Sequence, residues 1–195
     1  MHRRVIVAGL WVAAAIAPAM AVAQAAASGG SAAGQASAAA VSPAESFNSL
    51  LSIMESQIVP AAEAMPADKF DFAPPTSFGL YAGVRTFAQQ VKHLTEANYS
   101  IFRAYGVPGA VDAKTIEALT TKDQIVDALK KSYAYAHAAV STITVENAFE
   151  PVGPPQRHLT RATLAAYGIA HSMDHYGQMV EYLRMNGIVP PASRR

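Results

Sequence analysis

The chain has 195 residues, a formal net charge of +1 and no cysteine. Its balanced charge, without a basic run, predicts that nucleic acid is not a partner. The lack of cysteine excludes disulfides, thiolate metal ligands and a lipoprotein anchor, so any metal must be held by nitrogen and oxygen atoms.

The first 23 residues have the pattern of a secretory signal peptide. A short basic start, residues 1–4, precedes an apolar run from Val5 to Met20, and Ala21-Val22-Ala23 supplies a small-x-small cleavage site. The apolar run is too short for a comfortable transmembrane span. We therefore expect cleavage after Ala23, with Ala27 as the second choice, a periplasmic or secreted mature protein, and no stable membrane insertion.

The export route is open between two systems. The pair Arg3-Arg4 permits twin-arginine export, which carries folded proteins. The residues that follow it are an ordinary apolar run, which favours the general secretion route.

Residues 24–41 consist almost entirely of Ala, Ser, Gly and Gln, a composition that has little to bury. This segment is predicted to be a flexible linker. The remainder, residues 42–193, has a length that suits one domain with one core.

Helical periodicity and capping signals predict four long helices in that domain. Ser42-Pro43-Ala44-Glu45 is a capping box that starts a helix running to about Ala64. Its expected inner face is Phe47, Leu50, Leu51, Met54 and Ile58. The other helices are predicted from about Val84 to Tyr105, from a capping box at Thr121 to about Val145, and from Thr160 to Asn186.

No strand-like alternation is evident, so the prediction is an all-α four-helix bundle. Its first and third connections are longer than simple up-down turns require, and long loops are often functional.

Two histidines lie on one stripe of the last predicted helix. At about 100° per residue, His175 lies about 40° from His171, and Gln178 lies about 20° away on the other side. The same face should carry Leu164, Tyr167, Gly168, Tyr182 and Met185, with Gly168 leaving room beside the histidines.

An i, i+4 pair of imidazoles is a recurring way to hold a divalent cation. His93 on the second helix is the available third ligand. Three neutral nitrogens would leave one coordination position for water or substrate, as in catalytic sites. Gln178 is placed to orient that water or ligand, whereas Asp174, at the edge of the face, is expected at the surface.

The alternative is that these histidines are core residues paired with polar side chains such as Gln90, Asn98 or Gln178. Of the remaining histidines, His137 is interpreted as structural or surface-exposed and His158 as surface-exposed. Inverted-zincin, di-iron and haem sites are disfavoured. The first would need a further downstream ligand, and the others would need Glu-x-x-His pairs or C-x-x-C-H.

Two blocks of sequence resemble the DinB-like (DinB/YfiT) superfamily. H-S-M-D-H-Y-G-Q-M-V-E-Y-L-R-M-N-G-I-V-P-P is similar to its closing helix, and G-V-R-T-F-A-Q-Q-V-K-H-L-T-E-A-N-Y is similar to its second helix. The resemblance covers about Pro43 to Ser193. It implies a four-helix bundle with one long crossover and one divalent metal held by His93, His171 and His175.

That family includes thiol S-transferases and maleylpyruvate isomerase-like enzymes. The resemblance implies the fold and the metal site but not the reaction. We expect a metal-dependent enzyme of hydrolase or thiol-transferase type, and imidazole ligation suits several first-row metals, with Zn²⁺ or Ni²⁺ expected. The alternative is a non-catalytic periplasmic module that binds metal or a small ligand. The expected partner is a small-molecule substrate or ligand, and a homodimer is left open. The general-base candidates are Glu96, Asp174 and Tyr182.

Overall fold

The computed structural model describes residues 40–194, so the predicted signal peptide and nearly all of the predicted linker lie outside the described residues. Within that range the chain forms α1 (Pro43–Ala64), α2 (Phe87–Phe102), α3 (Ala113–Glu117), α4 (Lys122–Val140) and α5 (Arg161–Met185). Short 3-10 turns are η1 (Ala67–Lys69), η2 (Thr76–Phe78), η3 (Arg103–Tyr105), η4 (Pro155–Arg157) and η5 (Pro191–Ser193). The β-type pairing described in residues 40–194 is one isolated bridge, Pro151 to Thr160. The predicted all-α class is confirmed.

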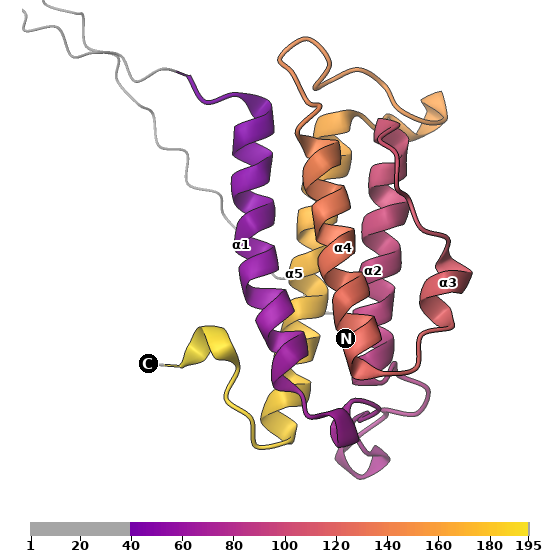
Figure 1. The fold of residues 1–195 in the computed structure, drawn as a ribbon, viewed down its shortest axis with the longest axis vertical. Helices are drawn as coiled ribbons and strands as arrows, with labels where there is room; N and C mark the ends of the chain where they lie inside the picture. The colour runs from indigo at the N-terminus through magenta and orange to yellow at the C-terminus, as the bar shows by residue number, and fades with distance from the viewer. Residues whose placement is uncertain (1–39, 195) are drawn as a thin grey trace, which may run out of the picture. The chain divides into compact units, whose positions relative to one another are not determined.

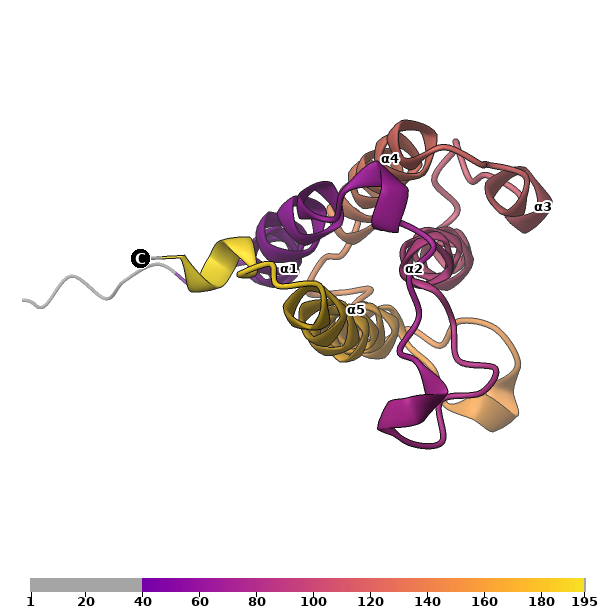
Figure 2. The same ribbon diagram turned by 90° about the horizontal axis from the view of Figure 1, so that it is seen from below.

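The four long helices pack as a bundle around one core. The neighbours around the ring are α1 with α5, α5 with α2, α2 with α4, and α4 with α1, as the end-on view shows (Figure 2). In Figure 1, α1 and α5 run in one direction, and α2 and α4 run in the other. The parallel neighbours α2 and α4 therefore need a long connection, which carries α3 back along the outside of the bundle (Figure 1). The four-helix bundle is confirmed, and the crossover is its second connection.

None of the helices within residues 40–194 combines the length and the apolar character that a bilayer crossing requires.

The helix starts follow the capping chemistry of the sequence. Capping boxes at Ser42 and Thr121 are present as predicted. The second helix begins three residues later than expected, because Thr86 also forms a capping box. The Thr86 hydroxyl accepts from the Gln89 amide at 3.2 Å, and the Gln89 side chain accepts from the Thr86 amide at 2.8 Å. An N-cap residue has extended backbone, so the helix cannot begin at Val84.

Two features of the connections differ from the prediction. Helix α4 ends at Val140 rather than Val145, since Thr144 and Asn147 satisfy each other's backbone amides in a turn of their own. Helix α3 was expected to be loop. It is a single turn capped by Asp112, with Ile116 as its buried residue, and one apolar position produces no periodic signal.

The inner faces are close to those predicted, with corrections at Leu50 and Gly168 and, on α5, at Tyr167 and Met185, which are 56% and 37% exposed. Leu50 is 46% exposed, because the adjacent Leu51 takes the core position in register with Met54 and Ile58. Gly168 does not make room for the histidines. A Cβ there would lie 2.7 Å from the Phe102 ring, so this glycine allows α5 to approach the buried end of α2.

Candidate metal centre

Three histidines from two neighbouring helices meet on one side of the bundle. His93 comes from α2, and His171 and His175 come from α5. The ring centroids are 5.2 Å apart for His93 and His171, 4.8 Å for His93 and His175, and 4.5 Å for His171 and His175. One nitrogen from each ring lies within 4.8 Å of the others. The residues that sequence spacing selected are thus close enough to share one ion.

The closest approach in this cluster is between two ring nitrogens. Nε2 of His171 and Nε2 of His175 lie 3.2 Å apart. Two nitrogens bound to one tetrahedral zinc ion at about 2.0–2.1 Å would be roughly 3.3 Å apart. The donor set is three imidazoles, which suits zinc, nickel and other first-row metals. The residues therefore fit a divalent cation.

A chain of side-chain hydrogen bonds fixes the orientation of His175. A carboxylate only accepts, so the Gln178 amide nitrogen donates to Asp174, at 3.2 Å. This leaves the Gln178 oxygen to accept from the Gln90 amide nitrogen, at 2.8 Å. The Gln90 oxygen then accepts from Nδ1 of His175, at 2.7 Å.

The consequence is a defined tautomer. With its proton on Nδ1, neutral His175 carries its lone pair on Nε2, the nitrogen that faces His171. Metal-ligating histidines usually donate their other ring nitrogen in this way, and the partner sets both ring orientation and basicity. Gln90, which is 3% exposed, supplies that partner here.

Burial keeps the cluster neutral. Desolvation is the main cause that lowers the pKa of His93 and of His171, and the positive charge of Arg85 acts in the same direction on both. For His175, desolvation and the neighbouring histidines lower the pKa to about 4. Neutral imidazoles have the free lone pair that a cation needs, so protons compete little at neutral pH.

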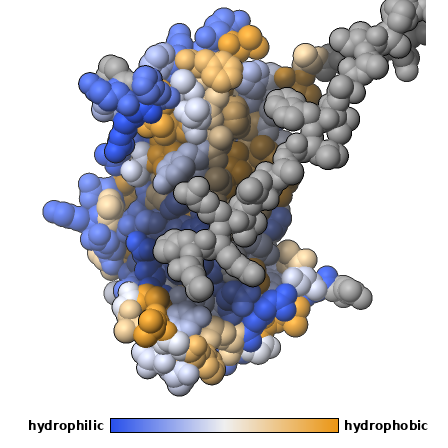
Figure 3. Space-filling view, turned by 180° about the vertical axis from the view of Figure 1, so that it is seen from behind, coloured by the Kyte–Doolittle hydropathy of each residue, from blue (hydrophilic) through white to orange (hydrophobic). Residues whose placement is uncertain are grey.

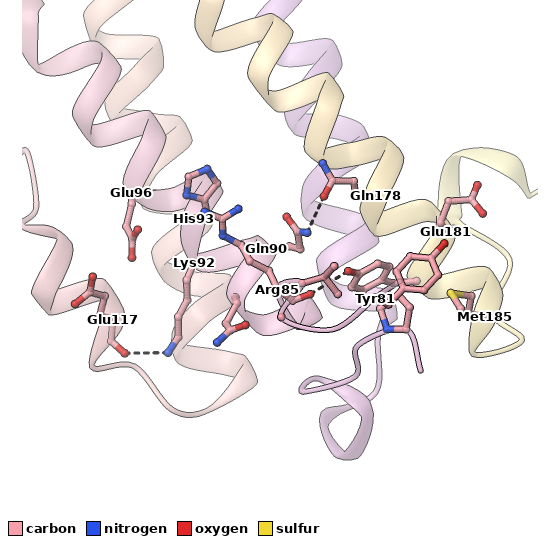
Figure 4. Close-up of a pocket in the computed structure, with 15 residues that line it drawn as sticks. Tyr81, Arg85, Gln90, Lys92, His93, Glu96, Glu117, Gln178, Glu181 and Met185 are labelled. Carbon is pink, nitrogen blue, oxygen red and sulfur yellow. Dashed lines mark hydrogen bonds between the residues drawn. The ribbon is translucent and has the colours of Figure 1, made fainter. Parts of the chain in front are cut away.

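A cavity of about 1080 Å³ opens beside His93. Figure 4 shows its lining, which includes Tyr81, Arg85, Gln90, Glu96, Gln178 and Glu181. Figure 3 shows the α2 and α5 face of the bundle, with hydrophilic residues gathered across its middle between more hydrophobic areas above and below. The cavity has the size of a small-molecule site.

The three general-base candidates have different surroundings. The Tyr182 hydroxyl donates to the Arg85 carbonyl at 3.0 Å, and Asp174 accepts from Gln178. Glu96 lines the cavity with His93, and burial, followed by the charge of Glu117, raises its pKa. Among the three, Glu96 is the carboxyl group placed to exchange a proton with a molecule in the cavity.

The other predicted residues lie as follows. Gln178 lines the cavity but is also held between Gln90 and Asp174. Tyr167 was expected on the buried face but is 56% exposed, with its ring 6.0 Å from that of His171.

The two remaining histidines of the described residues lie outside the cluster. His137 is partly buried between α1 and α4, where it bonds Asn48 at 2.6 Å and Glu55 at 3.1 Å. His158 is exposed, with a positive φ of 49° in the α4–α5 loop. Of the core partners proposed for the site histidines, Asn98 instead bonds Ser132.

Sequence reasoning missed Arg85. This residue precedes the N-cap of α2, and no periodic pattern links it to the histidines. It reaches them because the 66–86 connection folds back over the end of the bundle, which a helical stripe cannot reveal.

The fold and the histidine cluster define a four-helix bundle with a three-imidazole site between its second and last long helices. The family model described as "DinB superfamily" matches residues 50–179, and the chain belongs to that superfamily. No curated protein matches the chain.

Proposed function

We propose that this protein binds one divalent metal ion, zinc or nickel, through His93, His171 and His175. The observation that carries the proposal is the 3.2 Å approach of the two Nε2 atoms, with His175 held in the required tautomer by Gln90. The core-histidine alternative accounts for the contact of His175 with Gln90. It gives no reason for His93 to approach the same point from the neighbouring helix α2.

We further propose that the bound metal serves an enzyme of hydrolase or thiol-transferase type that acts on a small molecule. A metal in this site would act as a Lewis acid that lowers the pKa of a water or thiol and polarises a substrate group. The cavity would bind the substrate and limit its access to water, and Glu96 would hold or release the proton that the reaction moves.

The second candidate is a non-catalytic module that binds metal or a small ligand. The observation in its favour is that Asp174 and Tyr182 are both engaged in hydrogen bonds, which leaves Glu96 without an acid-base partner of its own. A screen for metal-dependent hydrolase and S-transferase activity separates the two. If the protein is an enzyme, the wild type should turn over a substrate in this screen. Glu96→Gln should then lower the rate at least tenfold and leave the metal content unchanged.

The location that we propose is the periplasm or the exterior of the cell, on the basis of the signal-peptide pattern of residues 1–23. There the protein would take up a metal that binds tightly to three imidazoles.

The test of the metal proposal is elemental analysis of the purified mature protein. We expect about one equivalent of metal per chain, and loss of most of it in His171→Ala/His175→Ala. His158→Ala is the matched control, because it removes an exposed histidine outside the cluster. Equal metal content in the double variant and the wild type would refute the proposal.

A further inference from the structure

Arg85 is held in place by its main chain at the edge of the cavity. Its carbonyl oxygen accepts from the Tyr182 hydroxyl at 3.0 Å, which ties it to α5, and the next residue caps α2. From this fixed base the side chain extends towards His93 (Figure 4). The main chain of Arg85 is therefore anchored by both helices that supply the histidines.

The guanidinium has no protein partner in the described structure. The ion pairs formed within residues 40–194 involve Lys130, Lys131 and His137, and no hydrogen bond from the Arg85 side chain is present in that range. The other cation of the cavity differs, since Lys92 donates to the carbonyl of Glu117 at 2.9 Å. Arg85 is thus the cavity's cation whose donors are free for a ligand.

Charge balance indicates the kind of ligand. Three neutral imidazoles would leave a divalent ion with its full charge, and Arg85 adds a further positive charge close by. The same proximity contributes to lowering the pKa of all three histidines. The negative charge of Asp174 acts in the opposite direction on the pKa of His171 and His175, but its carboxylate is hydrogen-bonded to Gln178 and not to the cluster. A loaded site with these charges favours an anion between metal and guanidinium.

Two further features of the lining restrict that anion. Glu96 and Glu117 lie on one side of Arg85 and Glu181 lies on the other, so a second negative charge on the ligand would be repelled (Figure 4). The lining also includes the apolar groups of Tyr81, Val84, Tyr182 and Met185. Tyr81, Val84 and Met185 are exposed by 36–40% and suit an apolar body, whereas Tyr182 is buried in the core.

We propose that Arg85, together with the coordination position left open by the three histidines, binds the carboxylate of a monoanionic substrate whose apolar part lies along Tyr81, Val84 and Met185. The inference rests on the proposed metal site. A guanidinium can donate two parallel hydrogen bonds to a planar carboxylate, and this geometry favours a carboxylate over a spherical anion such as chloride.

The experiment is a calorimetric titration of Co²⁺-loaded protein with hexanoate, acetate, hexanamide, succinate and inorganic phosphate. We compare the wild type with Arg85→Gln and with Arg157→Gln, which removes an exposed arginine of the α4–α5 loop. Because Arg85 is exposed and only its main chain bonds the fold, the substitution should leave folding intact. Metal content and melting temperature are measured first for all three proteins.

We expect hexanoate to bind the loaded wild type, and Arg85→Gln to weaken it about tenfold or more with metal content unchanged. Arg157→Gln should match the wild type. Acetate should bind about tenfold more weakly than hexanoate because it lacks the apolar body, and hexanamide and succinate should also bind more weakly.

Failure of the two proposals can be distinguished. A wild type that takes up no metal refutes the proposed function. Normal metal content with equal hexanoate affinity in the wild type and Arg85→Gln refutes the carboxylate subsite alone. Preferential binding of phosphate or succinate would likewise overturn the assignment of a monocarboxylate.

Discussion

At the residue scale, the proposed metal site depends on polar side chains that would not themselves contact the metal. Gln90 is the sole bonded partner of Nδ1 of His175 among the described residues, and its own orientation depends on Gln178 and Asp174. Replacing Gln90 by leucine would free the His175 ring to rotate and would remove the acceptor that fixes its tautomer.

We therefore expect Gln90→Leu to weaken metal binding about 10- to 100-fold, the usual effect of removing such a partner. Competition with a chelator of known affinity measures it. Gln178→Leu should have a smaller effect because it acts one step further away, and Gln156→Leu, on an exposed loop, should have none. An affinity unaltered by Gln90→Leu would contradict the relay.

The pH dependence of stability follows from the lowered pKa of His175. In the metal-free protein the unfolded chain takes up a proton near pH 6.5, whereas folded His175 does so only near pH 4. The unfolded state thus binds more protons in this window, so the free energy of unfolding falls as pH falls from 6.5 towards 4. At about 1.4 kcal/mol per pKa unit, the loss is about 3 kcal/mol.

Urea unfolding of chelator-treated protein between pH 7 and pH 4 tests this expectation. His175→Gln removes the titrating group and should flatten the acid limb of the curve. Parallel curves for the wild type and the variant would show that His175 does not titrate as its burial implies.

The sequence predicted the three histidines for two reasons. Helical spacing places His171 and His175 on one face of the last helix and leaves His93 as the available third ligand, and the resemblance to the family indicates the same three residues. It could not rank Gln90 above Asn98 as their partner, since each lies on the buried side of the second helix. Arg85 was missed altogether, because its place depends on the path of a loop rather than on a period.

At the element scale, the approach of α5 to α2 depends on one glycine. A Cβ on Gly168 would stand 2.7 Å from Cζ of Phe102, and that ring is fully buried and cannot move aside. Overpacking of this kind costs about 1–3 kcal/mol, more than the gain of up to about 1 kcal/mol in helix propensity. We expect Gly168→Ala to lower the free energy of unfolding.

Gly177 is the matched control on the same helix. Nothing lies within 4 Å of a Cβ placed there, so Gly177→Ala should raise stability by up to about 1 kcal/mol. Chemical denaturation of both variants measures the difference. If Gly168→Ala also raised the free energy of unfolding, α2 and α5 would be able to move apart at Gly168 without cost, and the expectation would be wrong.

The sequence predicted the helices better than their connections. Capping boxes involve residues close in the chain, so the starts at Ser42 and Thr121 were readable. The box at Thr86 was equally local but was overlooked in favour of the apolar pattern. The placement of the crossover between α2 and α4 was not readable, because helix direction depends on which faces pack together.

At the scale of the whole molecule, the proposed export would determine where the proposed metal is acquired. Twin-arginine export would carry a folded bundle already loaded in the cytoplasm, whereas general secretion delivers an unfolded chain that binds metal outside. Because an ordinary apolar run follows Arg3-Arg4, we expect the general route.

Replacing Arg3 and Arg4 together by lysine tests this expectation. The substitution keeps the positive charge, so the amount of exported protein should stay nearly unchanged. Lost export in the Lys-Lys variant would indicate the twin-arginine route. Mass spectrometry of the exported chain would show whether it begins at Gln24, as cleavage after Ala23 requires.

We propose that the folded protein binds a divalent cation through His93, His171 and His175. The direct measurement is the melting temperature of chelator-treated protein as Zn²⁺ or Ni²⁺ is added. A ligand that binds the native state stabilises it by about 2.7 kcal/mol at a hundredfold excess over its Kd, so the melting temperature should rise with metal concentration. In His171→Ala/His175→Ala the rise should be absent, and in His158→Ala it should be complete. Two results would contradict metal binding by these three histidines. One is a wild type that melts at the same temperature with and without metal, and the other is a double variant whose melting temperature rises as much as that of the wild type.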